Sequence, residues 1–496
     1  MIKDVVSWYK EAVFYEIYVP AFCDSNGDGT GDLPGVISRL DYLKELGVNA
    51  LWLTPFYPSP LVDNGYDISN YLKVDERYGT LTDFDRLLEK AHEAGIRVIV
   101  DMVLNHTSSR HEWFEKSRRG EAGYADYYIW KENVPNNWES FFDGSAWEYD
   151  SVRKMYYYHA FSKEQACLNW SNEAVRLECM DILRFWLERG VDGFRLDVIN
   201  FLKTDLTAFL ADNPEKNGEQ EHLYDKNQFG CKEAIASIAM LVHSYPDRFL
   251  LGEIGEEDLK LISSYIGPGL LDSAFYFNLG SMDEWNEEYL FRQIRLMEAL
   301  HAYPTLFFSS HDMRRHFSRL CEERTEKACL IAMFLLTAKG IPFLYQGEEL
   351  PASDVCLKQL SDIQDVQGRY AYEKMLGEGK DEKQAFVYAK KRTRDYSRGL
   401  LDWNVFSEKQ VFEGPVFLLY KELLALRREH KALRQGAYGK LTLNGKILSY
   451  ERITDAEVLL VMLDFSEKGL YMAADDSILL SLHKEDGTVI GYIQKK

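Results

Sequence analysis

Four acidic residues that could do chemistry stand at the ends of apolar, β-rich runs in this sequence. Asp101 ends VIVD, Asp197 ends DGFRLD, Glu253 ends LLGE, and Asp312 follows FFSSH. Charged side chains are costly inside apolar strands unless they are paired or functional, and four successive cases exceed what isolated ion pairs explain. Two such carboxyls can cleave a glycosidic bond, one by donating a proton and the other by attacking an oxocarbenium-like centre. The residue types therefore suggest glycoside cleavage.

Further polar residues accompany these carboxylates. Arg195 precedes Asp197 by two residues, and His106 and His311 stand close to the other acidic positions. An Arg beside a nucleophilic carboxylate is expected to keep it ionised and aimed through charge-assisted hydrogen bonds. The acid must instead hold its proton near neutral pH, which burial and neighbouring carboxylates favour.

The elements that must position these residues alternate between strand-like and helix-like runs. The β-rich runs cover residues 13–19, 49–55, 97–103, 191–198, 249–254, 274–278, 306–310 and 341–346. Helical spacing of apolar residues covers residues 32–47, 81–95, 173–190 and 326–340. Eight strands alternating with helices predict an α/β fold, a (β/α)8 TIM barrel. In such a barrel, functional side chains collect at the C-terminal ends of the strands, where the four carboxylates are placed.

Two long segments interrupt the alternation. Residues 104–165 are polar, aromatic and too long for a simple loop, so they predict a subdomain inserted after the third strand. A second insertion follows the eighth strand at residues 347–403, and a helix at 415–428 leads to alternating strands. The predicted division is a barrel of residues 1–103 and 166–430, the inserted subdomain, and a C-terminal antiparallel β domain of residues 431–496.

Composition excludes several classes of protein. The 496 residues include 58 Lys and Arg and 79 Asp and Glu, so the net charge is −21, which disfavours a nucleic-acid partner. The seven cysteines form no CxxC pair, and an odd, unpatterned count favours reduced thiols. No secretion signal or run of ~18 apolar residues is present, so we expect a cytoplasmic protein without a membrane partner. The oligomeric state is left open.

Four short motifs, DMVLNH, GFRLDV, GEI and SSHD, resemble the conserved regions of glycoside hydrolase family 13, the α-amylase family, over nearly the whole chain. The resemblance implies that Asp197 is the nucleophile, Glu253 the acid/base and Asp312 the third carboxylate, which grips sugar hydroxyls. His106, Arg195 and His311 would line the subsite of the cleaved glucose. The residue matching Asp101 is often structural in the family.

Three features resemble the oligo-1,6-glucosidase branch, which includes dextran glucosidase and trehalose-6-phosphate hydrolase. In DNGYDISNY, Asp63 and Tyr66 match residues that hold a non-reducing glucose in exo-acting enzymes. Val198 follows the nucleophile, and in this branch Val there accompanies α-1,6 bonds, although β-branched residues also suit strands in general. RDYSR resembles RDNAR, in which the last Arg, here Arg398, contacts the glucose.

The chain also departs from that branch. QACLNW at residues 165–170 replaces QPDLNW, and RGLLDW at residues 398–403 replaces RTPMQW, both near the expected pocket rim. These departures leave the aglycone open. The resemblance predicts a retaining exo-α-glucosidase acting on short α-1,6-linked isomalto-oligosaccharides, with hydrolysis of trehalose 6-phosphate or sucrose isomerisation and transglucosylation as alternatives. A non-catalytic transporter subunit is disfavoured, because all three carboxylates are kept.

A loop near the N-terminus has the alternating oxygen ligands of a Ca²⁺ site. The sequence DSNGDGTGD places Asp24, Asn26, Asp28, Thr30 and Asp32 at every second position, without the Glu that completes an EF-hand. The resembling branch holds Ca²⁺ in this loop, so we expect a structural Ca²⁺ bound by these four side chains and the Thr30 carbonyl. No organic cofactor is expected.

Overall fold

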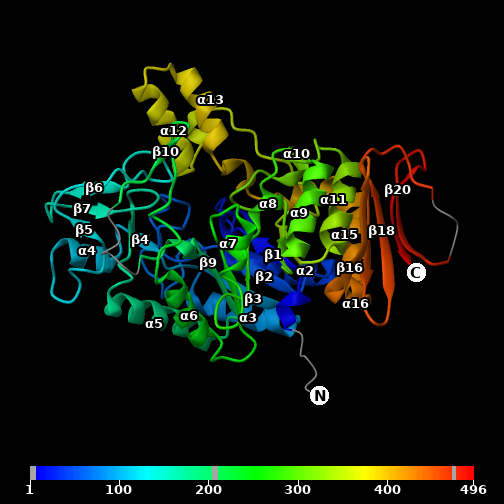
Figure 1. The fold of residues 1–496 in the computed structure, drawn as a ribbon, viewed down its shortest axis with the longest axis horizontal. Helices are drawn as coiled ribbons and strands as arrows, with labels where there is room; N and C mark the ends of the chain where they lie inside the picture. The colour runs from blue at the N-terminus through cyan, green and yellow to red at the C-terminus, as the bar shows by residue number, and fades with distance from the viewer. Residues whose placement is uncertain (1–6, 204–210, 472–475) are drawn as a thin grey trace.

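The structure is a computed structural model, and it describes residues 7–203, 211–471 and 476–496. Eight parallel strands form one sheet in the order β13, β12, β9, β3, β2, β1, β15, β14 (Figure 1). Their bounds are β1 Phe14–Ile17, β2 Ala50–Leu53, β3 Arg97–Val103, β9 Gly193–Asp197, β12 Phe249–Gly252, β13 Ser273–Ala274, β14 Thr305–Leu306 and β15 Ile341–Tyr345. The sheet is a nearly closed barrel, which confirms the predicted fold.

The seam of the barrel lies between β13 and β14. There the Thr305 hydroxyl donates a hydrogen bond to the Ala274 carbonyl at 3.1 Å and accepts one from the Tyr276 N–H at 3.1 Å. Both strands are shorter than the sequence predicts. Strand β13 is short because the chain turns into helix α8, Phe277–Gly280, soon after it. A side-chain hydroxyl therefore joins the two strands.

Helices alternate with the strands and surround the sheet (Figure 1). They are α1 Leu33–Ser38, α2 Leu40–Leu46, α3 Leu81–Glu93, α5 Glu173–Arg189, α6 Cys231–Val242, α7 Leu259–Ser263, α9 Glu287–Ala299, α10 His316–Arg319, α11 Thr325–Thr337 and α15 Pro415–Glu429. Local sequence sets their ends: Thr80 and Asp83 form a capping box on α3, and Gly190 ends α5 with a φ of 101°. Apolar residues at helical spacing in α5, such as Ile182 and Trp186, are buried against the barrel.

The segment after β3 has its own small core. Strands β4 His106–Ser108 and β8 Gln165–Cys167 pair, and β5 Trp130–Lys131, β6 Trp147–Asp150 and β7 Met155–Tyr158 form a three-stranded sheet, with helix α4 Glu112–Arg118 beside them. Trp138, Trp147 and Tyr158 pack together in a separate aromatic cluster. We call residues 104–165 the inserted subdomain.

The segment after β15 forms a helical hairpin of α12 Val366–Gly377 and α13 Glu382–Arg392, which stands above the barrel beside the inserted subdomain (Figure 1). The Tyr370 hydroxyl donates to the Glu164 carboxylate at 3.1 Å, and Lys374 pairs with Asp143 at 2.7 Å. The two insertions therefore contact each other over the C-terminal ends of the strands.

The C-terminal region is an antiparallel sheet in the order β16, β17, β18, β20, β19. Its strands are β16 Ala437–Asn444, β17 Ile447–Ile453, β18 Val458–Asp464, β19 Ile478–His483 and β20 Val489–Lys495, and short helices α14 Trp403–Glu408 and α16 Lys431–Gln435 precede it. Leu448 and Val461 share one buried cluster with Leu330 of α11, so this sheet and the barrel share a core.

Candidate active site

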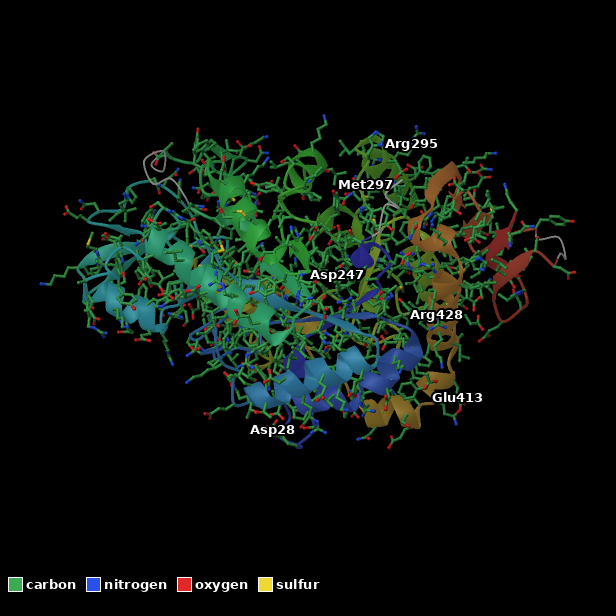
Figure 2. All side chains as sticks on the ribbon, turned by 90° about the horizontal axis from the view of Figure 1, so that it is seen from below. Asp28, Asp247, Arg295, Met297, Glu413 and Arg428 are labelled. Atoms are coloured by element: carbon green, nitrogen blue, oxygen red, sulfur yellow. The ribbon has the colours of Figure 1, made fainter. Side chains whose placement is uncertain are left out.

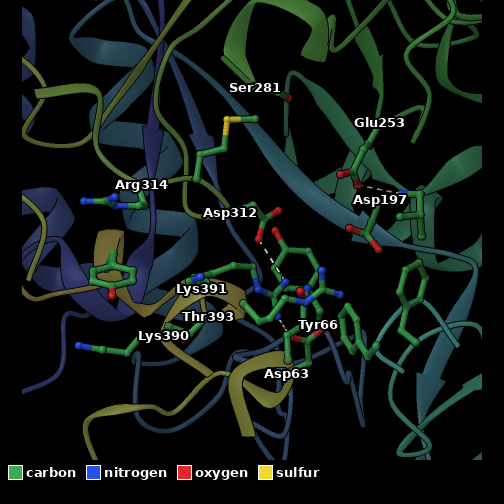
Figure 3. A pocket seen from close by; sticks show the side chains of 18 of the residues that line it. Asp63, Tyr66, Asp197, Glu253, Ser281, Asp312, Arg314, Lys390, Lys391 and Thr393 are labelled. Atoms are coloured by element: carbon green, nitrogen blue, oxygen red, sulfur yellow. Dashed lines mark hydrogen bonds and ion pairs between the residues drawn. The ribbon is translucent and has the colours of Figure 1, made fainter. Parts of the chain in front are cut away.

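A cavity of about 870 Å³ opens at the C-terminal ends of the barrel strands, between the inserted subdomain and the helical hairpin. Six of the predicted site residues line it: Asp63, Tyr66, His106, Asp197, Glu253 and Asp312. Figure 3 labels five of them, all except His106. The side chains of Arg195, His311 and Arg398 do not line it but contact residues that do. The nine predicted residues thus form one connected site.

One guanidinium joins three carboxylates. Arg195 Nη1 lies 2.6 Å from Asp197 Oδ1 and 2.9 Å from Asp101 Oδ1, and Arg195 Nη2 lies 2.6 Å from Glu253 Oε2. Glu253 Oε2 also accepts the Val198 N–H at 3.1 Å. Because Asp197 ends β9 and Glu253 follows β12, which pair directly, the parallel register brings both carboxylates to one guanidinium.

The charges of this cluster do not balance, since three carboxylates share one cation. Burial, together with the nearby charges of Glu253 and Asp101, raises the pKa of Asp197 well above its ordinary value, and Arg195 opposes the rise without cancelling it. Burial also raises the pKa of Asp101, which is fully buried and bonded to Trp52 and Tyr66. Asp197 and Asp101 therefore hold a proton more readily than isolated carboxylates would.

Asp312 has the opposite environment. Its Oδ1 accepts hydrogen bonds from Arg398 at 2.9 Å and Arg394 at 3.2 Å, and its Oδ2 lies 3.2 Å from His311 Nε2. Although burial acts to raise the pKa of Asp312, His311, Arg394 and Arg398 together hold it below its ordinary value. With 31% of its side chain exposed, this carboxylate presents a stable negative charge to the cavity.

A chain of hydrogen bonds fixes the ring of His311. Its Nδ1 lies 2.6 Å from Glu16 Oε1, which comes from β1, and its Nε2 lies 2.7 Å from the Tyr66 hydroxyl. The Tyr66 ring stacks on the His311 ring at 5.4 Å, and its hydroxyl also donates to Asp101 Oδ2 at 3.0 Å. Tyr66 thereby connects the Asp312 side of the cavity to the Arg195 cluster.

Arg394 is the site residue that the sequence prediction missed. Its Nη2 lies 2.5 Å from Asp63 Oδ1 and 2.6 Å from Asp365 Oδ1, while its Nη1 reaches Asp312. Arg394 lines the cavity, whereas Arg398 lies behind Asp312 and donates from Nε to the His311 carbonyl at 2.8 Å. The RDYSR motif pointed to this segment, but it could not show which Arg faces the cavity.

Gln165, also outside the predicted set, links Asp63 to His106. Its Nε2 lies 3.0 Å from Asp63 Oδ2 and 3.1 Å from His106 Nε2. Burial lowers the pKa of His106 to about 3, so its ring is neutral and can exchange hydrogen bonds with a sugar hydroxyl. Phe142 and Phe161 complete this end of the cavity with aromatic faces.

Val198 has a strained backbone. Strand β9 ends at Asp197, and Val198 adopts a φ of 35° and a ψ of 45°, a left-handed conformation that β-branched residues rarely take. Strand propensity therefore does not explain this Val. Its side chain lines the cavity directly beside Asp197, and its N–H points at Glu253.

The predicted metal loop is ordered by its own side chains. Asp24 accepts hydrogen bonds from the N–H groups of Asn26, Gly27 and Gly29, and Asp28 lies exposed at the molecular surface (Figure 2). Asp32 is buried and serves both sides: its Oδ1 caps α1 by accepting the Gly35 N–H at 2.6 Å, and its Oδ2 accepts the Ser25 hydroxyl of the loop at 2.8 Å. Among the residues that the structure describes, no three His, Cys, Asp or Glu side chains are grouped as a metal site. The loop thus fits the predicted Ca²⁺ ligand set only in part.

Several known proteins are similar to this chain in fold and in sequence. A family model described as the alpha-amylase catalytic domain matches residues 16–436. An oligo-1,6-glucosidase of Bacillus cereus is 33% identical, over 97% of this chain and 95% of that protein. A trehalose-6-phosphate hydrolase of Escherichia coli strain K12 is 35% identical, over 93% and 91%. A crystallised trehalulose synthase mutant has a TM-score of 0.91 at 30% identity, over 98% of this chain and 99% of that one. Within the described ranges, no helix is long and apolar enough to cross a membrane.

Proposed function

Because this chain belongs to the α-amylase family and is a glycoside hydrolase, we propose that it is a retaining, exo-acting α-glucosidase. Its substrates are short α-glucosides, and it releases the terminal glucose from the non-reducing end. We assign α-1,6-linked isomalto-oligosaccharides as the preferred class, in keeping with the similar oligo-1,6-glucosidases.

The observation that carries this proposal is the closed end of the cavity. Arg394 ties Asp63, Asp365 and Asp312 together across one side, and Gln165 ties Asp63 to His106. A network closed in this way leaves room for a terminal sugar and blocks a chain that continues past it. We call this part of the cavity the closed end.

The two carboxylates on Arg195 can divide the chemistry. Asp197 attacks the anomeric carbon, while Glu253 donates a proton to the leaving oxygen, so that the glycosidic bond breaks and a glucosyl ester forms on Asp197. Glu253 then removes a proton from water, which attacks the ester and releases glucose with its original configuration. This division of roles requires Glu253 to carry a proton and Asp197 to be ionised when the substrate binds.

Asp312 and Arg394 position the sugar. The negative charge of Asp312 can accept hydrogen bonds from two hydroxyls, and these bonds strengthen as positive charge develops on the ring. Arg398 holds Asp312 from behind, and its Nη1 is buried without a hydrogen-bond partner among the described residues. Asp312 is thus pre-organised before the sugar enters.

A substrate panel tests the proposal. We expect glucose release from isomaltose to exceed that from maltose, sucrose, trehalose and trehalose 6-phosphate when kcat/KM values are compared. Release of the α-anomer, followed by NMR at early times, checks retention. A β-anomeric first product or a ranking led by maltose would contradict the mechanism or the bond preference, respectively.

We also propose that the loop from Asp24 to Asp32 binds a structural Ca²⁺, and Asp32 Oδ2, which now accepts hydrogen bonds from Ser25 of the loop, would bind the ion instead. An ion that binds only the folded state stabilises it in proportion to the logarithm of its concentration. A chelator is therefore expected to lower the Tm by a few degrees while changing the initial rate little. Identical melting with chelator and with added Ca²⁺ would remove this site.

A further inference from the structure

One carboxylate of the barrel contacts the site through a single other residue. Glu16 lies on β1, its side chain is 2% exposed, and it does not line the cavity. Among the described residues, both hydrogen bonds that its side chain accepts come from His311. The backbone N–H of His311 lies 3.0 Å and its ring Nδ1 2.6 Å from the same oxygen, Glu16 Oε1. The Glu16 side chain can therefore act on the reaction only through His311.

The charge of Glu16 must be neutralised where it lies. A buried carboxylate is costly unless a cation pairs with it or a proton binds to it. Within residues 7–203, 211–471 and 476–496, no Lys or Arg forms an ion pair with Glu16, so the proton of its bond with His311 must do this. The backbone N–H that Oε1 also accepts favours the ionised carboxylate. The proton of the 2.6 Å bond then belongs to His311 Nδ1.

The other ring nitrogen of His311 faces acceptors as well. The Tyr66 hydroxyl lies 2.7 Å and Asp312 Oδ2 lies 3.2 Å from Nε2. The Tyr66 hydroxyl donates its own proton to Asp101 Oδ2 at 3.0 Å, and Asp312 is ionised, so both oxygens can accept a hydrogen bond from Nε2. A neutral imidazole has one N–H, whereas an imidazolium has two. The contacts of His311 thus match the charged form of its ring.

The wider surroundings of this pair agree with a cation. The charged and titratable groups around Glu16 and His311 are Tyr18, which follows β1, Tyr66, Asp101, Asp312, Tyr345 of β15, Arg195 and Arg398. Both arginines disfavour a further cation, but both are already paired with carboxylates of the same group. The rings of Tyr66 and Tyr18 lie nearly parallel to the imidazole, with centroids at 5.4 and 6.2 Å, and aromatic faces attract a cation. Glu16 supplies the negative charge that a cationic His311 requires.

We propose that Glu16 is a positioning residue that keeps His311 as an imidazolium, whose Nε2–H holds Asp312 and Tyr66 in place for the sugar. This inference rests on the proposed exo-α-glucosidase function, in which Asp312 grips the sugar hydroxyls. The proton between Glu16 and His311 stays there throughout the cycle, and neither residue makes or breaks a bond of the substrate. Charge-assisted hydrogen bonds of this kind are shorter and stronger than neutral ones, which suits the fixing of a carboxylate.

The first test removes the charge of Glu16 and keeps its shape. Glu16→Gln should lower kcat/KM for isomaltose by about tenfold at pH 7.5, because an imidazolium without its carboxylate gives up the proton at a lower pH. At pH 5.5 the ring is protonated again, and the variant should come within about threefold of the unaltered enzyme. Glu16→Asp keeps the charge, so its ratio to the unaltered enzyme should be the same at both pH values. No loss in Glu16→Gln, or a loss that is equal at both pH values, overturns the proposal.

Asp272→Asn is the matched control for Glu16→Gln. Asp272 precedes β13 outside the cavity, and its Oδ2 likewise accepts a backbone N–H, from Leu250 at 2.8 Å, and lies 2.9 Å from a ring nitrogen of His243. The kcat/KM of this variant should keep the same ratio to that of the unaltered enzyme at pH 7.5 and pH 5.5. If the ratio instead changes with pH as it does in Glu16→Gln, the effect is not specific to His311 and the proposal fails.

A second test does not depend on turnover. In enzyme labelled with ¹⁵N-histidine, the ring resonances of His311 are identified by their absence from the spectrum of His311→Gln. They should show two protonated nitrogens at pH 7.5 in the unaltered enzyme and one unprotonated nitrogen in Glu16→Gln. An unprotonated nitrogen in the unaltered enzyme overturns the proposal even if that enzyme hydrolyses isomaltose. Two protonated nitrogens in an enzyme that hydrolyses no α-glucoside would support the charged pair and contradict the proposed function.

Discussion

The closed end of the cavity and the last turn of α13, residues 390–392, border one cavity but differ in how their charges are paired. At the closed end, Arg394 forms ion pairs with three carboxylates. In the same cavity, Asp197 and Glu253 both form ion pairs with Arg195. The last turn of α13 belongs to the inserted hairpin, and within the described residues none of its three cations, Lys390, Lys391 and Arg392, forms an ion pair with a carboxylate. The difference teaches that one insertion serves in two ways: Arg394 and Asp365 pair with other charges and fix the closed end, whereas the cations at the end of α13 are not neutralised by ion pairs.

The largest expected effect comes from changing the proposed nucleophile, which lines the same cavity as the closed end. Asp197→Asn should lower kcat by about 10⁴-fold or more, because the nucleophile is lost while its shape is kept. The change removes one of three carboxylates that share Arg195, so the Tm should not fall. Activity within tenfold of the unaltered enzyme would overturn the assignment of Asp197 as nucleophile, provided that circular dichroism shows the same fold.

A smaller loss is expected when the pairing is loosened without loss of charge. Arg394→Lys keeps the cation but cannot bridge Asp63, Asp365 and Asp312 at once, because a Lys is a single point charge. We expect kcat/KM for a neutral α-glucoside to fall by about 10²-fold through misplacement of the sugar.

Arg369→Lys is the matched control for that variant. Arg369 lies on α12 outside the cavity and donates hydrogen bonds to Ile363 and Gln364. The kcat/KM of the Arg369→Lys variant should therefore stay within twofold of that of the unaltered enzyme. If kcat/KM falls by the same factor in both variants, the effect reflects the hairpin as a whole, and Arg394 in particular does not hold the closed end.

A change of specificity is expected from the residue that follows the nucleophile. Val198→Ala removes side-chain volume beside Asp197, and the ratio of kcat/KM for isomaltose to that for maltose should fall by about three- to tenfold. Steady-state assays on both disaccharides measure this ratio. An unchanged ratio would show that linkage preference is set by the insertions and not beside the nucleophile.

The smallest effect concerns stability and pH. Burial lowers the pKa of His106 from 6.5 to about 3. Between these two values the imidazole is protonated in the unfolded chain but neutral in the folded chain. The contribution of His106 to the free energy of unfolding is fully present above pH 6.5 and is lost as the pH falls toward 3. The loss between pH 6.5 and pH 5 is about 2 kcal/mol. Asp312 acts in the same direction only below its ordinary pKa, because its folded-state pKa is lowered.

Thermal melts of His106→Gln check this prediction. The decrease in Tm from pH 7.5 to pH 5 should be smaller in the variant than in the unaltered enzyme, whatever their difference at pH 7.5, where the imidazole is neutral in both states. Parallel Tm profiles across this range would mean that His106 does not titrate differently in the folded and unfolded states.

The sequence was most informative where the chemistry lies on strands. Asp197 and Glu253 were predicted to lie at one end of the barrel, because the C-terminal ends of parallel strands lie on the same side. Both do contact one guanidinium, that of Arg195. Arg394 could not be assigned in this way, since its contact with Asp63 joins positions 331 residues apart through an insertion without regular spacing. Likewise, the sequence did not place Lys390 beside the cavity, because it lies in the same insertion.

Arg195 has one further consequence for the catalytic cycle. With Glu253 protonated, the proposed resting cluster of Asp101, Asp197, Glu253 and Arg195 carries a net charge of −1. Once Asp197 becomes an ester and Glu253 has given up its proton, the charge is again −1, although it has moved from one carboxylate to the other. Because both carboxylates contact the same guanidinium, the surrounding dipoles need little rearrangement between the two half-reactions.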